Sequence, residues 1–210
     1  MVHRLLENKK VLMVFAHCDD EIICGWPIFQ EKSIEKKILI TSSDLKNKKR
    51  KWCRHRKNVF FEVCDQYAVE GHCLDYNSDF YMLETRKESL TNMQIDICEK
   101  IRSMGEFDYI FCHNPLGEYG HLDHKMIFDI VINNFDIPVL ITDISIKTNW
   151  PSHNNCIPKH LQRIYYQNQI ATCNADMEIY NHVQQIYENH KVWTWSTPAV
   201  KECNLYLLNP

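Results

Sequence analysis

The stretch Val11-Leu-Met-Val-Phe-Ala-His-Cys-Asp-Asp-Glu21 decides how the rest of the chain is interpreted. Its first six residues are uninterrupted apolar side chains, a pattern typical of a parallel strand that is buried on both faces. The pattern ends abruptly in a histidine, a cysteine and three acids. Ligands of open α/β sheets bind beyond the carboxyl ends of the strands, so we expect a functional site at this polar tip.

The composition fits one globular domain. The chain has 210 residues, of which 45% are hydrophobic and 24% charged, enough for a single core. We expect one domain over residues 1–210, with a core at about 9–143 and an extension at about 145–210 that packs onto it. The net charge of −3 gives no general reason to expect nucleic acid as a partner. Because the sequence has neither a long apolar run nor a signal peptide, we expect a cytoplasmic protein without a membrane span.

Ten cysteines are scattered along the chain without any C-x-x-C pair. Zinc ribbons need such pairs, and disulfide frameworks belong to secreted chains. The thiols are therefore interpreted as small buried hydrophobic side chains in a reducing compartment.

Strand and helix patterns alternate between residues 10 and 143. Strands are expected at 10–16, 38–41, 68–74, 109–112 and 138–142. Helices are expected to begin near Trp26, at Arg56, at a capping box beginning with Thr85, and near His121, with one more helix at about 177–187. The alternation predicts an α/β, three-layer domain with a mostly parallel sheet in the order 3-2-1-4-5 plus C-terminal additions.

In that order the first and fourth strands are neighbours, so the tip at 17–21 should face the segment 113–124. Two histidines and one carboxylate bind a divalent ion and leave a coordination position for water, and we select His17, Asp20 and His124. Asp19 and His121 then remain for proton transfer. Each motif also has a structural interpretation when taken alone, as a satisfied polar side chain or a helix N-terminal cluster of acids.

Eight of the 24 lysines and arginines lie between Lys46 and Lys57. This stretch is either a solvated loop or a binding site for a substrate phosphate, since guanidinium and ammonium groups suit phosphate oxygens.

Two segments resemble the signatures of one known family. Ala16-His-Cys-Asp-Asp-Glu21 resembles the A-H-P-D-D-E signature of the LmbE-like (PIG-L) family of zinc-dependent N-acetylglucosaminyl deacetylases, and His113-Asn-Pro-Leu-Gly-Glu-Tyr-Gly-His-Leu-Asp-His124 resembles its second signature. The resemblance runs from about residue 9 to 143, with a weaker echo at Trp193-Thr-Trp195. It implies a Rossmann-like domain that hydrolyses the acetamide of an amino sugar and releases acetate and a free amine.

The resemblance assigns roles to single residues. It makes His17, Asp20 and His124 the zinc ligands and Asp19 the general base, which agrees with the interpretation from the residues alone. It makes His121 the general acid or electrostatic partner of the reaction.

Further roles implied by the resemblance concern the surroundings of the ion. Asp123 is expected to tune the His121 imidazole, and Tyr119 to contact the oxyanion or the substrate. Arg56 corresponds loosely to a substrate-binding arginine, and His113 and Asn114 are expected to orient the substrate, with a structural role as the alternative for His113.

The chain departs from the family pattern at three places. Cys18 replaces the usual proline, and Cys24-Gly-Trp-Pro27 stands where a glycine-rich segment is usual. Val59 occupies the position expected for an acid three residues after Arg56.

The expected function is therefore N-deacetylation of a GlcNAc-type sugar, as a soluble nucleotide sugar or a small glycoside, with one Zn²⁺ per chain or Fe²⁺ in its place. Two other functions fit the same residues. One is a non-haem iron(II) oxygenase, because its facial triad is also two histidines and a carboxylate. The other is a catalytically silent domain that binds a nucleotide sugar or glycan.

Overall fold

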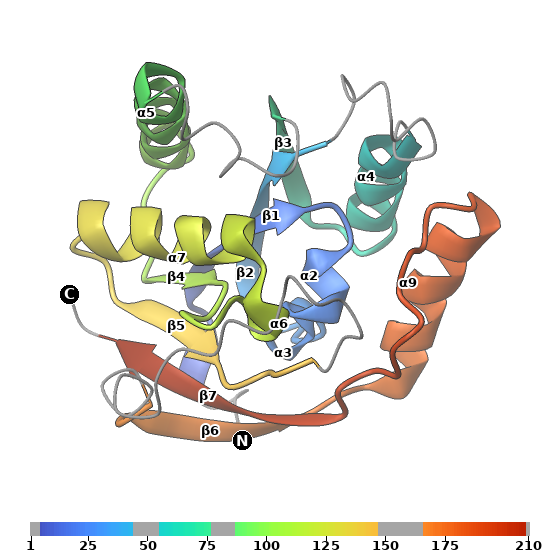
Figure 1. The fold of residues 1–210 in the computed structure, drawn as a ribbon. Helices are drawn as coiled ribbons and strands as arrows, with labels where there is room; N and C mark the ends of the chain where they lie inside the picture. Colours follow the sequence, from blue (N-terminus) through green and yellow to red (C-terminus); the bar gives the residue numbers. More distant parts are fainter. Residues whose placement is uncertain (1–4, 44–54, 77–86, 147–165, 209–210) are drawn as a thin grey trace.

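The computed structural model describes residues 5–43, 55–76, 87–146 and 166–208, which form a seven-stranded sheet with helices on both faces (Figure 1). The sheet has the strand order β3-β2-β1-β4-β5-β7-β6. Its strands are β1 (Lys10–His17), β2 (Glu35–Ser42), β3 (Glu70–Tyr76), β4 (Tyr109–Cys112), β5 (Val139–Thr142), β6 (Gln169–Asn174) and β7 (Glu202–Leu208).

The first five strands pair in parallel in the predicted order 3-2-1-4-5. Strand β7 then pairs antiparallel with β5 and with β6, which closes one side of the sheet. The C-terminal additions are thus two antiparallel strands, whose individual positions the sequence did not predict.

Two groups of helices cover the two faces of the sheet. The first group is α2 (Asp20–Ile23), α3 (Trp26–Phe29), α4 (Arg56–Gln66) and α9 (Met177–Asn189); the second is α5 (Lys87–Ser103) and α7 (Leu122–Asn134). In β1, Met13 and Phe15 pack toward the first group, whereas Leu12 and Val14 pack toward the second. The apolar run is continuous because alternate residues enter two separate cores.

The chain after β1 turns helical earlier than predicted. A short helix, α2, begins directly at Asp20, and α3 begins at Trp26 with Pro27 in its first turn, where proline is tolerated. The predicted irregular loop before Trp26 is therefore one helical turn.

Several predictions are confirmed and others fall on segments outside the described residues. Helix α7 begins after His121, and α5 ends before Gly105, which has a φ of 107°. Thr85 and most of the basic stretch lie outside the described residues, as do Cys53 and Cys156. All eight cysteines within the described ranges have free thiols. In the described part of the chain no helix combines the length and apolar character needed to cross a bilayer.

Candidate metal centre

The pairing of β1 with β4 brings the two polar tips together. Val14 lies opposite Cys112, so the chain leaves both strands at the same edge of the sheet. His17 ends β1, and α7 begins after the short helix α6 (Gly117–Gly120) that follows β4. Helix α7 projects His124 toward His17, and the two imidazole centroids are 5.2 Å apart.

Three ligand atoms form a compact triangle at this edge. His17 Nδ1 lies 3.3 Å from Asp20 Oδ2 and 3.2 Å from His124 Nε2, and the remaining side, from His124 Nε2 to Asp20 Oδ2, is 3.5 Å. Ligands of a tetrahedral zinc ion at about 2.0–2.1 Å are separated from one another by about 3.3–3.4 Å. The triangle therefore has the size of one face of a zinc tetrahedron, and the residues fit a divalent ion with an open position.

The charge state of Asp20 suits a ligand. Burial acts to raise the pKa of its carboxyl, but the neighbouring imidazoles of His124 and His113 hold that pKa well below its usual range. Asp20 Oδ2 also accepts the backbone N–H of His17 at 2.8 Å, which fixes the carboxylate beside the strand end.

A second carboxylate orients each of the two imidazoles. Asp123 Oδ2 lies 3.2 Å from His17 Nε2, and Glu118 Oε2 lies 2.6 Å from His124 Nδ1. Carboxylates that bind the outer ring nitrogen in this way leave the inner nitrogen as a lone-pair donor for a metal. Asp123 was expected to tune His121, but its carboxylate lies nearer to His17 than to His121 Nδ1, which is 4.0 Å away.

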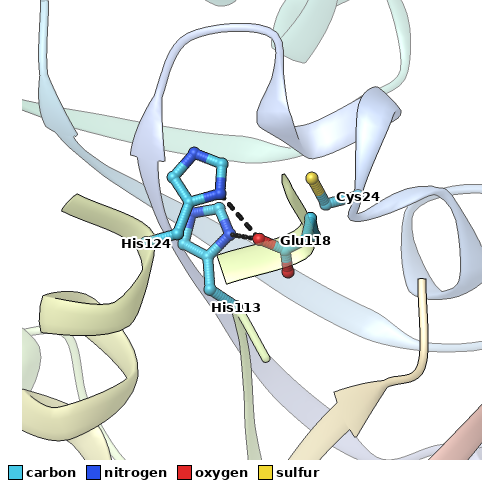
Figure 2. A group of neighbouring side chains, drawn as sticks. All are labelled: Cys24, His113, Glu118 and His124. Atoms are coloured by element: carbon cyan, nitrogen blue, oxygen red, sulfur yellow. Dashed lines mark hydrogen bonds and ion pairs between the residues drawn. The ribbon is translucent and has the colours of Figure 1, made fainter. Parts of the chain in front are cut away.

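Glu118 is a member of the site that sequence reasoning missed. It has a positive φ of 54° between Gly117 and Gly120, which also have positive φ values. Figure 2 shows its carboxylate between His113 and His124, where Oε2 lies 3.0 Å from His113 Nδ1. Burial acts to raise the pKa of Glu118, but these two imidazoles lower it to about 2. The glycines on both sides of an acid were the available signal, because they mark a loop with unusual backbone geometry.

Cys24, His113, Glu118 and His124 could also be considered as ligands of one ion (Figure 2). The His113 and His124 rings are stacked, however, with centroids 3.7 Å apart and planes inclined by 17°. An ion cannot lie in the plane of two rings stacked in this way. This arrangement instead suits a carboxylate that accepts a hydrogen bond from each ring.

A second alternative is a set of three histidines, His17, His121 and His124, whose ring nitrogens also lie close together. His121 caps α7, and its Nδ1 accepts the backbone N–H of Asp123 at 3.2 Å. The His121 ring is 4.7 Å from each of the other two rings by centroid. His121 therefore stands beside the triangle, where a proton donor would be needed.

His113 and Asn114 are completely buried. His113 Nε2 accepts the Ala16 N–H at 2.9 Å, and Asn114 Nδ2 donates to the Ile144 carbonyl at 2.8 Å. Asn114 Oδ1 also accepts the backbone N–H groups of two loop residues, Leu116 and Glu118. For these two residues the geometry favours support of the loop over the predicted contact with substrate.

Asp19 lies next to the triangle, and its side chain is 2% exposed. Its carboxylate is paired with the Arg56 guanidinium of α4. Burial raises the pKa of Asp19 to about 7, although Arg56 acts to lower it. Arg56, predicted to bind substrate, thus contacts the predicted base, and it finds in Asp19 an acidic partner that Val59 could not supply.

The same fold occurs in solved deacetylases. The deacetylase of the teicoplanin biosynthesis pathway, solved in complex with teicoplanin, has a TM-score of 0.63 and 9% identity over 96% of this chain and 99% of its own. The A40926 pseudoaglycone deacetylase has a TM-score of 0.61 and 10% identity over 97% and 98%. The chain has the fold of these deacetylases.

Sequence comparison gives less. No family model matches the chain. An uncharacterized protein of Acanthamoeba polyphaga mimivirus is 24% identical over 184 residues, which cover 78% of this chain and 80% of that protein.

An aromatic wall stands on one side of the centre in this deacetylase fold. The Tyr119 ring meets His124 and Trp195 edge-on, at centroid distances of 5.1 and 4.9 Å. Trp195 also borders a shallow, mostly apolar pocket, lined by Ile23, Ile146, Tyr180, Trp195, Thr197, Pro198 and Val200. The predicted packing of the C-terminal tryptophans onto the domain is confirmed, because Trp193 and Trp195 both pack against the core.

Proposed function

We propose that the protein is a zinc-dependent N-deacetylase of the LmbE-like kind, which removes the acetyl group from a GlcNAc-type amino sugar. The main support is the triangle of His17, Asp20 and His124, whose sides of 3.2–3.5 Å match a zinc tetrahedron. The deacetylase fold supports the same reaction class. The substrate we favour is a soluble nucleotide-linked sugar or a small glycoside.

In this proposal His17, Asp20 and His124 hold the ion, and Asp123 and Glu118 hold the two imidazoles. A zinc ion bound there supplies a Lewis acid, which polarises the amide carbonyl and lowers the pKa of water.

The remaining residues of the centre handle protons and charge. Asp19 takes a proton from the attacking water, and Arg56 keeps its carboxylate in place. His121 delivers a proton to the departing amine, and Tyr119 lies where it can contact the developing oxyanion. The products balance as acetate and a free amino sugar.

The reaction is tested by mass spectrometry of free, nucleotide-linked and lipid-linked N-acetylhexosamines incubated with the enzyme and one equivalent of zinc. Excess metal is avoided, because one teicoplanin deacetylase has been solved in a zinc-inhibited form. Loss of one acetyl group is the expected result. Oxygen-dependent oxidation of a substrate in place of hydrolysis, or binding without turnover, would overturn the proposal.

Asp19→Ala tests the base. This variant should keep its zinc and lose turnover, whereas Asp65→Ala, which removes an exposed acid of α4, should leave both unchanged. Wild-type turnover in Asp19→Ala would show that another group takes the proton.

A further inference from the structure

The backbone at Asp19 has a conformation that its own side chain does not favour. Its φ is 101° and its ψ is −20°, at the start of α2. A residue other than glycine in this region costs on the order of 1–3 kcal/mol and persists only when its surroundings hold it. The contacts that hold Asp19 therefore decide where its carboxylate points.

One of these contacts is the third acid of the sequence motif. The backbone N–H of Asp19 donates to Glu21 Oε2 at 2.8 Å. The other oxygen of that carboxyl group, Oε1, accepts the hydroxyl of Tyr187 at 2.6 Å. Glu21 and Tyr187 are completely buried. The two hydrogen bonds thus form a water-excluded chain from the Asp19 amide to helix α9.

Helix α9 follows the whole parallel sheet in sequence, and Tyr187 lies 166 positions after Glu21. Figure 1 shows α9 on the same side of the sheet as α2 and α4. Helix α4 in turn supplies Arg56, which pairs with the Asp19 side chain. Asp19 is consequently held twice, at its amide from α9 and at its carboxylate from α4.

We infer that Glu21 and Tyr187 are positioning residues that aim the Asp19 carboxylate at the metal centre. This inference rests on the proposed function, in which Asp19 is the base. The named hydrogen bonds of Glu21 and Tyr187 reach Asp19 and each other, whereas Asp123 and Glu118 orient the metal-binding histidines. Disturbing the pair should therefore affect proton transfer without removing the ion.

Tyr187→Phe is the first test, because it removes one hydroxyl and keeps the ring that fills the core. We expect kcat to fall by about ten-fold to a hundred-fold, as misplacement of a catalytic group does. KM should stay within about two-fold, and zinc content should be unchanged. Tyr166→Phe is the matched control, because the Tyr166 hydroxyl is buried without a hydrogen-bond partner among the described residues.

Hydrogen exchange at the Asp19 amide provides a readout that does not depend on activity. The amide should exchange at least about ten-fold faster in Tyr187→Phe than in the wild type or Tyr166→Phe, because the acceptor Glu21 loses its second anchor. Unchanged exchange together with unchanged kcat would overturn the inference even if the wild type is an active deacetylase. If the wild type has no deacetylase activity, the proposed function fails, and exchange still tests the link between α9 and Asp19.

Substitutions of Glu21 separate positioning from packing. Glu21→Met removes both hydrogen bonds and should lower kcat at least as much as Tyr187→Phe. Glu21→Gln should recover most of that loss, since its amide can accept the Asp19 N–H and donate to the Tyr187 oxygen. The double variant Glu21→Met/Tyr187→Phe should be no slower than Glu21→Met alone, and additive losses would contradict a single chain of hydrogen bonds.

Discussion

The Arg56 guanidinium forms an ion pair with the Asp19 carboxylate inside the protein, with the two side chains 10% and 2% exposed. The pair joins the start of α4 to the loop after β1. In the proposed reaction it also joins the arginine that the family resemblance implied to the base. Its loss should therefore be felt in both stability and activity.

Arg56→Gln should lower the free energy of unfolding by about 3 kcal/mol, because it leaves a buried carboxylate without its countercharge. Urea denaturation measures this change. Lys57→Gln is the control at the next position, where the partner is Asp75 and both side chains are partly exposed. The control should cost less than about 1 kcal/mol. Equal effects of the two variants would show that the Arg56 pair has no special weight.

Zinc removal should lower the melting temperature. An ion present at about a hundred times its dissociation constant contributes about 2.7 kcal/mol, which corresponds to about 5–10 °C for a domain of this size. Thermal scans with and without a chelator give the shift. Asp20→Asn should abolish it, whereas His121→Ala should keep most of it. The reverse pattern would favour the set of three histidines as the ligands.

Glu118→Gln should weaken zinc binding by about ten-fold to a hundred-fold, as loss of a carboxylate behind a histidine ligand does. The amide can accept a hydrogen bond from only one side, so either His113, His124 or the Asn114 N–H meets a second donor. Competition with a chromogenic chelator measures the affinity. Glu178→Gln, an exposed change in the first turn of α9, is the control. An unchanged affinity in Glu118→Gln would exclude this supporting role.

The sequence predicted the elements whose signal is local or follows from topology. The apolar run that ends at His17 identified a buried strand, and the strand order then placed His17 near His124. Strands β6 and β7 escaped prediction because they are short antiparallel strands near the C-terminus, where Gln169–Asn174 has an irregular alternation of buried and exposed residues.

The supporting residues could not be predicted, because their roles depend on contacts far apart in the chain. Tyr187 supports Asp19 through Glu21, although the sequence of α9 marks it only as a core residue. Asp123 lies one residue before a predicted ligand, yet its carboxylate turns toward His17. Such orientations are set by the packing of one element on another, which a periodic pattern does not encode.

Trp195→Ala should raise KM for the sugar substrate by about ten-fold while kcat changes less. Trp195 is half-buried, meets Tyr119 edge-on and borders the apolar pocket, so its loss removes surface that binds substrate before and during the reaction. Steady-state kinetics on the substrate found by mass spectrometry measure both constants. Trp195→Phe keeps an aromatic edge against Tyr119 and should recover part of the affinity. A fall in kcat with KM unchanged would instead mean that Trp195 acts on the reacting groups through Tyr119.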